Sequence, residues 1–155
     1  MTEQIRKNVF ETNSSSSHSL TVSEGDITGQ PFSDHTLREG VVIVGKGEYG
    51  WEFEQYYGIY DKLAYLITQI NYEDIPQGDA ATVTAELRES DPRFDMLCRV
   101  VEEHTGVKLQ VQPGSTGYVD HQSSDVGLEL FDDEKQLRQF LFNSNSYIET
   151  DNDNH

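Results

Sequence analysis

Residues 12–21 form the stretch of the chain that most restricts its local structure. The sequence there is Thr-Asn-Ser-Ser-Ser-Ser-His-Ser-Leu-Thr, in which nearly every side chain carries a hydroxyl, an amide or an imidazole. Such side chains hydrogen-bond to nearby main chain and compete with helix formation, so the run favours turns and caps. It also offers many donors and, at His18, a group that titrates near neutral pH. The run therefore predicts a polar bend suited to an anion or a polar small molecule.

Composition restricts the class of protein. The chain has 155 residues, 35% of them apolar, which by length predicts one folded domain with a core. Its net charge of −17 should repel nucleic-acid phosphates and anionic membranes, and should attract a basic groove on another protein. The lone Cys98 excludes an internal disulfide and a cysteine-based zinc site. No apolar stretch reaches membrane-spanning length and the N-terminus is not signal-like, so we expect a cytoplasmic protein.

Hydrophobic periodicity predicts an α+β fold with a mainly antiparallel sheet and about three helices. We expect a single compact domain over residues 1–148, followed by a polar acidic tail over residues 149–155. The serine run should be the bend of a hairpin, and residues 23–39 should be a loop. The expected helices cover residues 59–70, 91–106 and 133–141, the last with a capping-box pattern. The remaining expected strands cover residues 41–44, 107–111, 126–130 and 147–148.

Four segments resemble proteins encoded by bacteriophages and their hosts. The longest runs from Arg6 to Leu20 and contains Phe-Glu-Thr-Asn-Ser-Ser-Ser-Ser-His-Ser. Shorter similarities cover residues 47–52, 118–123 and 140–143. The resemblance is to a family of small phage-encoded proteins; it implies a viral origin, with the infected host cell as compartment, and it carries no activity.

Two histidines are the candidates for acid–base chemistry, since imidazole titrates near working pH. His18 lies in the serine run, and His121 lies in a second polar segment. The alternative is that both are simply polar loop residues. The paired His-x-Ser/Thr pattern of two-histidine phosphoesterases is met by His121-Gln122-Ser123 but not at His18, so that enzyme class is disfavoured. The ligand-binding candidates are Asn13, Ser14, Ser15, Ser16, Ser17, Ser19, Lys46, Trp51 and Ser123.

The turn Gly45-Lys46-Gly47 follows an apolar strand and could cradle a phosphate with its amides and one cation. It lacks the full P-loop spacing, and a hairpin turn explains it more simply. The spacing of His18, Asp120, His121 and Asp125 fits no helical metal motif, and neither a metal nor another cofactor is expected.

Two functions remain open. In the first, the serine and histidine residues line a pocket that binds, and could turn over, a phosphorylated small molecule such as a nucleotide. In the second, the chain is an acidic viral interaction protein, a nucleic-acid mimic that occupies the basic groove of a host defence enzyme or nucleic-acid enzyme. Neither function includes direct nucleic-acid or membrane binding, and the oligomeric state stays open.

Overall fold

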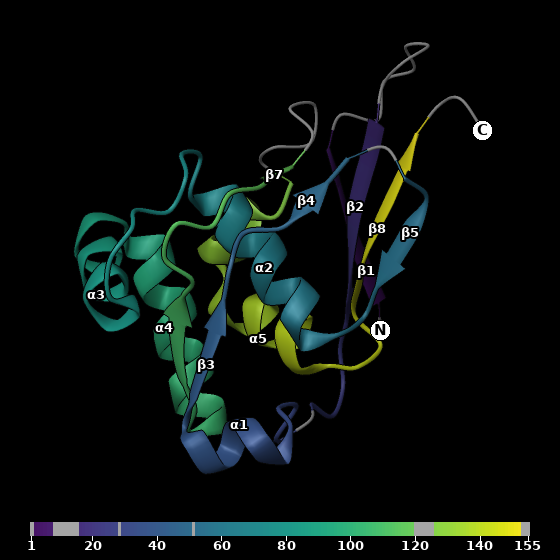
Figure 1. The fold of residues 1–155 in the computed structure, drawn as a ribbon. Coiled ribbons are helices and arrows are strands. Elements are labelled where there is room, and N and C mark those ends of the chain that lie inside the picture. The colour runs from purple at the N-terminus through teal and green to yellow at the C-terminus, as the bar shows by residue number, and fades with distance from the viewer. Residues whose placement is uncertain (1, 8–15, 28, 51, 120–125, 153–155) are drawn as a thin grey trace.

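The structure is a computed structural model that describes residues 2–7, 16–27, 29–50, 52–119 and 126–152. It is a small α+β fold in which strands and helices alternate irregularly along the chain (Figure 1). The elements are β1 (Thr2–Lys7), β2 (Ser16–Ser23), α1 (Asp34–Glu39), β3 (Val41–Val44), β4 (Glu48–Tyr49), β5 (Glu54–Tyr56), α2 (Ile59–Ile70), α3 (Ala80–Ser90), α4 (Pro92–Thr105), β6 (Lys108–Val111), β7 (Tyr118–Val119), the 3-10 helix η2 (Leu128–Asp132), α5 (Glu134–Phe142) and β8 (Tyr147–Asn152).

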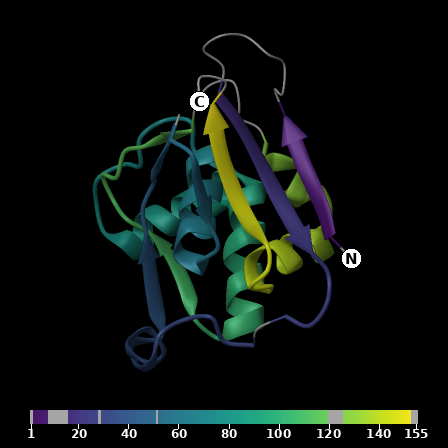
Figure 2. The same ribbon diagram turned by 90° about the vertical axis from the view of Figure 1, so that its right-hand side faces the viewer.

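The largest sheet has the order β1-β2-β8-β5, and every neighbouring pair in it is antiparallel. Figure 2 looks onto its open face, and α2 and α5 lie behind it. The register pairs Leu20 with Ile148, and both are fully buried against the helices. Because side chains alternate between faces, Ser19 and Thr21 point to the open face, where these short groups lie almost fully shielded in the middle of the sheet.

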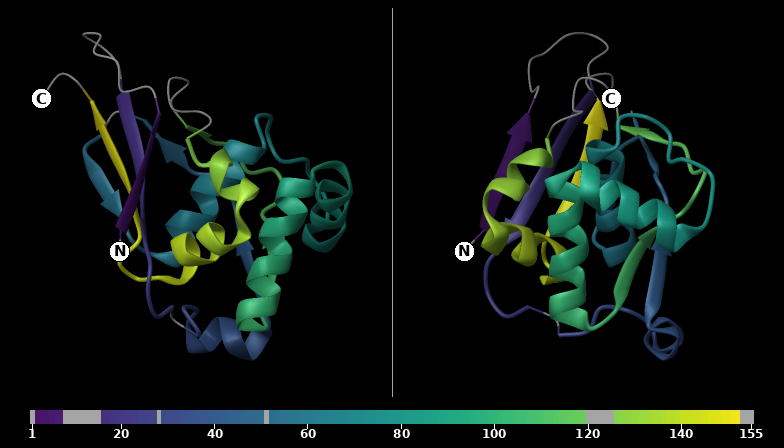
Figure 3. Two further views of the ribbon diagram at one scale, coloured as in Figure 1. Left: turned by 180° about the vertical axis from the view of Figure 1, so that it is seen from behind. Right: turned by 90° about the vertical axis from the view of Figure 1, so that its left-hand side faces the viewer.

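Two further strand pairs are parallel, namely β3 with β6 and β4 with β7. The sheets are therefore mixed, and the expectation of a mainly antiparallel sheet was wrong. Parallel pairing follows from the long connections between these strands, because α2, α3 and α4 lie between β3 and β6 in the sequence. The α3–α4 pair covers the side of the molecule opposite the large sheet, as the rear view in Figure 3 shows.

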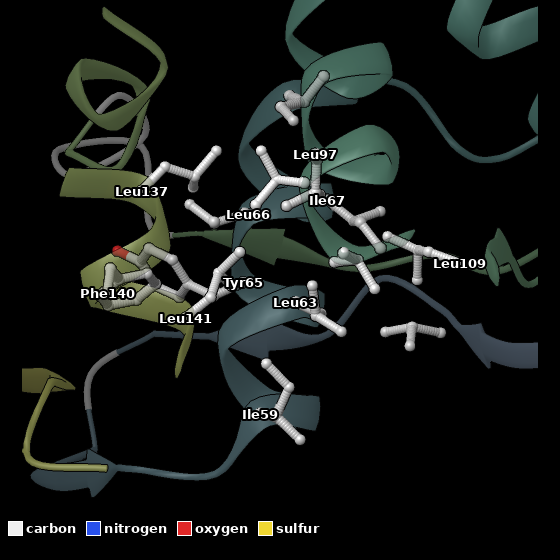
Figure 4. Close-up of a cluster of buried hydrophobic side chains, with 14 of the residues drawn as sticks. Ile59, Leu63, Tyr65, Leu66, Ile67, Leu97, Leu109, Leu137, Phe140 and Leu141 are labelled. Carbon is white, nitrogen blue, oxygen red and sulfur yellow. The ribbon is translucent and has the colours of Figure 1, made fainter. Parts of the chain in front are cut away.

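Helix α2 lies at the centre of the core. Leu63, Leu66 and Ile67 are fully buried, and Figure 4 shows them between Leu97 and Leu109 on one side and the helix α5 on the other. Nine of the twelve residues of α2 are buried, so the helix is covered on more than the one apolar face expected from its sequence. Lys62, Tyr65 and Gln69 form its second buried side, which has no apolar signal in the sequence.

Local capping signals correctly located the ends of two helices. Asp91 caps α4 through the amide of Arg93, Pro92 occupies the first turn, and Gly106 ends the helix at a φ of 76° that favours glycine. Asp133 caps α5 through the amides of Lys135 and Gln136. These ends were predictable because each depends on residues adjacent in sequence.

Several expectations need correction. The alternation at residues 126–130 predicted a strand, but Leu128–Asp132 is a 3-10 helix. The expected loop over residues 23–39 contains α1, and α1 and α3 exceed the predicted three helices. The expected acidic tail begins inside β8, whose residues up to Asn152 pair with β2. Half of the expected serine bend is also strand, because β2 begins at Ser16.

Among the helices of the described residues, none has both the length and the apolar character needed to cross a bilayer.

Lys62 is the most unusual buried group of the core, since its side chain is 1% exposed. Its Nζ donates a hydrogen bond to the Asn143 carbonyl oxygen at 3.2 Å and lies 5.6 Å from the centre of the Phe140 ring. Burial lowers the pKa of Lys62 from 10.5 to about 8. Within the described residues no carboxylate forms an ion pair with it, so the charged form is held by a helix end and a ring.

The pH dependence of stability tests this placement. Between about pH 8 and pH 10.5 the unfolded lysine binds a proton that the folded lysine has lost, so the free energy of unfolding contributed by Lys62 rises with pH there, by about 3 kcal/mol in all. Subtracting the Lys62→Met variant cancels opposing effects such as that of the Cys98 thiol, whose pKa burial raises to about 12. We expect the wild-type minus variant difference in urea unfolding to increase from about pH 7 to pH 9.5.

Lys108→Met is the matched control, because Lys108 is exposed at the start of β6. Its difference curve should lack the rise expected for Lys62→Met, because the Lys108 side chain stays in contact with water. A Lys62→Met curve that also lacks this rise would contradict the buried position of Lys62.

Candidate functional site

His18 lies in the core, in the middle strand β2, and its side chain is fully buried. Its Nε2 lies 2.9 Å from the Gly50 carbonyl oxygen, which can only accept, so this nitrogen carries the proton and donates. In the neutral ring Nδ1 then accepts a hydrogen bond from the Tyr65 hydroxyl at 3.0 Å. Both ring nitrogens are thus engaged with the protein's own groups, and the ring is placed to hold main chain in position.

The hydrogen bonds continue from Tyr65 along the second buried side of α2. The Gln69 side-chain amide donates to the Tyr65 hydroxyl at 3.4 Å, and its carbonyl accepts from the Gly127 amide at 2.5 Å. One polar chain therefore links β2, α2 and the segment before η2 through the core. Buried polar groups joined in this way are costly to disrupt, because each loss leaves its neighbour desolvated.

Thr150, like His18, donates a side-chain hydrogen bond to a main-chain carbonyl oxygen near the start of β5. The register places Thr150 of β8 directly opposite His18 of β2, so both side chains point to the core face. Thr150 Oγ1 donates to the Glu52 carbonyl oxygen at 2.6 Å. Hydrogen bonds from β2 and β8 thus hold the main chain at Gly50 and at Glu52, two residues that precede β5.

Of the other predicted site residues, Ser19 and Lys46 have described side chains, and neither lies with His18. Ser16 and Ser17 belong to β2, and Ser19 points to the open face of the sheet, on the opposite side from His18. The remaining candidates lie outside the described residues, namely Asn13, Ser14, Ser15, Trp51, His121 and Ser123. The predicted pairing of His18 with His121 therefore stays a prediction.

Lys46 lies in a packed connection. Its amide donates to Ser115 Oγ at 3.2 Å, and the next amide, of Gly47, donates to Thr68 Oγ1 at 2.9 Å. The Lys46 Nζ donates to the Glu73 carbonyl oxygen at 3.0 Å. The amides that a phosphate would need are thus already engaged. The turn is not a hairpin either, because β3 and β4 pair with β6 and β7 rather than with each other.

The surface next to the fixed main chain is both acidic and aromatic. We call it the acidic aromatic surface; its exposed members are Glu52, Phe53, Glu54, Tyr57, Tyr60 and Asp61. The exposed fraction is 59% for Phe53 and 47% for Tyr57, which is high for such large apolar rings. The ring of Tyr57 lies 4.7 Å from that of Tyr147, between centroids, so the aromatic area extends onto β8. Exposed aromatic side chains gathered on one surface are typical of interaction sites.

Three carboxylates of this surface surround one half-buried phenol. Burial raises the pKa of Tyr56, and the negative charges of Glu54, Asp61 and Glu52 raise it further. Burial also raises the pKa of the Asp61 carboxyl. The effect on Tyr56 shows that negative charge lies close to β5 and the start of α2.

Four arginines form ion pairs with carboxylates on the helical side of the molecule. The ion pairs on α3, α4 and α5 are Arg88 with Asp95 and Glu102, Arg93 with Asp91, Arg99 with Glu103 and Glu134, and Arg138 with Glu103 and Glu134. Across the part of the chain that the structure describes, no such pair involves a carboxylate of the acidic aromatic surface. The ion pairs among the described residues thus lie on the helical side, and the carboxylates around β5 take part in none of them.

The residues of this surface were not among the predicted site residues, although the sequence carries a signal for them. Residues 48–61 read Glu-Tyr-Gly-Trp-Glu-Phe-Glu-Gln-Tyr-Tyr-Gly-Ile-Tyr-Asp, with four acids, no lysine or arginine, and an aromatic at nearly every second position. The net charge of the whole chain does not locate this concentration. A local count of charge and aromatic residues would have found the segment.

Comparison of the chain with protein-family models, with curated proteins and with solved structures gave no significant match in any of the three.

The positioning role of His18 leads to a testable expectation. His18→Ala should lower the free energy of unfolding by about 2–4 kcal/mol, because it leaves a cavity and two desolvated hydrogen-bonding groups. The change should also speed amide hydrogen exchange in β5, because the Gly50 carbonyl loses its donor. Urea unfolding and exchange measured by mass spectrometry read out the two effects.

His35→Ala is the matched control, because His35 is exposed on α1. It should change stability by less than about 0.5 kcal/mol and leave exchange in β5 unchanged. Equal effects of the two substitutions would contradict a core role for His18.

Proposed function

We propose that the protein is an acidic interaction protein that binds the basic surface of a partner protein through the acidic aromatic surface. The observation that carries the proposal is the concentration of Glu52, Glu54 and Asp61 around Tyr56, with no described lysine or arginine paired to them. Unpaired carboxylates next to exposed rings match the chemistry of lysine and arginine side chains.

Long-range electrostatics supports the same kind of partner. A net charge of −17 attracts a positively charged surface and speeds encounter, and it opposes anionic ligands. The arginine ion pairs neutralise part of the charge on the helical side, whereas no described ion pair neutralises the carboxylates around β5.

A groove that evolved to hold nucleic acid is the partner surface with the closest chemical fit. Such grooves present lysine and arginine to phosphates and often aromatic rings to bases. Carboxylates in place of phosphates and exposed rings in place of bases would let a protein occupy the same groove. With a viral origin, the partner would be a host defence enzyme or another nucleic-acid enzyme.

The alternative function, binding of a phosphorylated small molecule at the serine run, has less support from the described residues. His18 lies fully buried with both ring nitrogens engaged, and Lys46 donates to a main-chain carbonyl. We therefore base the proposal on the acidic aromatic surface.

Matched charge removal tests the proposal. Glu52→Gln with Glu54→Gln removes two charges from the surface, and we expect it to weaken binding of a deca-lysine peptide about fivefold, since each exposed ion pair contributes up to about 1 kcal/mol. The control is Glu86→Gln with Glu89→Gln, which removes two charges from exposed positions of α3. The control should change affinity by less than twofold, roughly the effect of net charge alone.

Isothermal titration calorimetry at several salt concentrations gives the affinities, and a duplex oligonucleotide serves as the anionic counter-probe. Affinity for the peptide should fall with salt, and the oligonucleotide should not bind. Equal losses in the two double variants would refute the surface, and absence of any peptide binding would refute the function.

A further inference from the structure

We infer that the occupant of the acidic aromatic surface is an extended partner segment with alternating arginine and apolar side chains, which pairs with the outer edge of β5. This inference rests on the proposed function and specifies its partner. It follows from three features of β5: its edge position, the difference between its two faces, and its charge.

β5 is an edge strand of the large sheet. It pairs with β8 on one side, and in the described part of the chain no strand pairs with its other side (Figure 1). An edge strand presents main-chain amide and carbonyl groups that can extend the sheet by one strand from another protein. Residues 52–55 are all exposed with respect to the described part of the chain.

The two faces of β5 differ in chemistry. The register places Gln55 opposite Glu149 on the open face of the sheet, and their side chains hydrogen-bond at 2.8 Å. Tyr57, which directly follows the strand, packs against Tyr147 on this face, and extending the alternation by one residue before the strand places Phe53 there as well. On the other face, Glu54 lies beside Tyr56 together with Asp61 and Glu52. One face of the edge is therefore aromatic, and the other carries the carboxylates.

Successive side chains of an added strand would point alternately to the carboxylate face and to the open face. Side chains on the carboxylate face lie close to Glu54, where guanidinium groups can bind carboxylates with two parallel hydrogen bonds. Side chains on the open face lie against Phe53 and Tyr57, where apolar groups lose contact with water. Arginine fits the carboxylate face better than lysine, because its planar group can also stack on the Tyr56 ring.

Charge excludes a second copy of this edge as the occupant. Two β5 strands placed side by side would bring Glu52 and Glu54 of each copy together, and like charges across neighbouring strands destabilise pairing. Charge complementarity thus selects a basic strand of another protein.

The order of residues in a peptide tests the inference separately from the proposed function. The probes are two blocked octapeptides of the same composition, one alternating arginine and valine, the other with four arginines followed by four valines. We expect the alternating peptide to bind about tenfold more tightly to the full chain, since only it places its arginines on one face. A lysine–valine alternating peptide should bind less tightly than its arginine counterpart.

Variants of the chain give the second readout. Phe53→Ala with Tyr57→Ala should abolish the preference for the alternating peptide but keep salt-dependent binding of both. Tyr72→Ala, at a ring that is 93% exposed outside the surface, is the control and should leave the preference intact. Two N-methylated versions of the alternating peptide extend this test, one methylated at its odd-numbered and one at its even-numbered amide nitrogens. Only one of these two sets of amides can hydrogen-bond to β5, so only one of the two peptides should lose binding.

Equal affinity of the alternating and block peptides would overturn strand addition while leaving the proposed function in place. Failure of both peptides and of deca-lysine to bind would refute the proposed function itself. Peptide-independent dimerisation that is lost in the Phe53 and Tyr57 variant would show that a second copy is the occupant.

Discussion

The fold depends on the hydrogen bonds that the buried polar residues of α2 form inside the core. Lys62, Tyr65 and Gln69 are buried, and each contacts a different segment: the end of α5, the strand β2 and the segment before η2. Burial of such groups is unfavourable without partners, so these segments cannot shift independently of α2. The apolar side of α2 adds the larger part of the burial, but apolar contacts alone would tolerate several arrangements.

The same interior contacts determine where the acidic aromatic surface lies. His18 contacts Tyr65 with one nitrogen and the Gly50 carbonyl with the other, so a single ring connects α2 to the chain that leads into β5. Thr150, opposite His18, holds the Glu52 carbonyl. A binding surface that is positioned before its partner arrives loses less conformational entropy on association. In the proposed function, His18 would therefore contribute through the main chain that it orders.

The parts of the fold that the sequence predicted well are those set by neighbouring residues. Periodicity located α2, and caps at Asp91, Gly106 and Asp133 located α4 and α5. Parallel pairing of β3 with β6 was not predictable in this way, because it depends on segments more than sixty residues apart. The 3-10 helix at Leu128 was missed since short apolar runs fit several structures.

The candidate site shows the same division. His18 was chosen for its chemistry and its polar neighbours, but its partners Gly50 and Tyr65 are distant in sequence, so its burial was not predictable from local composition. Conversely, the carboxylates and rings of β5 are neighbours in sequence, and a local count would have found them. What no count supplies is their separation onto two faces of an edge strand, which follows only from the pairing with β8.

Negative charge around β5 also determines what a partner can gain there. The charges of Glu54, Asp61 and Glu52 raise the pKa of the Tyr56 phenol, and at about 0.15 M salt interactions between exposed charges are screened beyond about 8 Å. On the helical side four arginines pair with carboxylates, whereas no ion pair among the described residues involves a carboxylate of the acidic aromatic surface. In the proposed complex a cationic strand would therefore meet carboxylates that need not first leave a described cation of the same chain. Its arginines would gain charge-assisted hydrogen bonds without breaking a described ion pair.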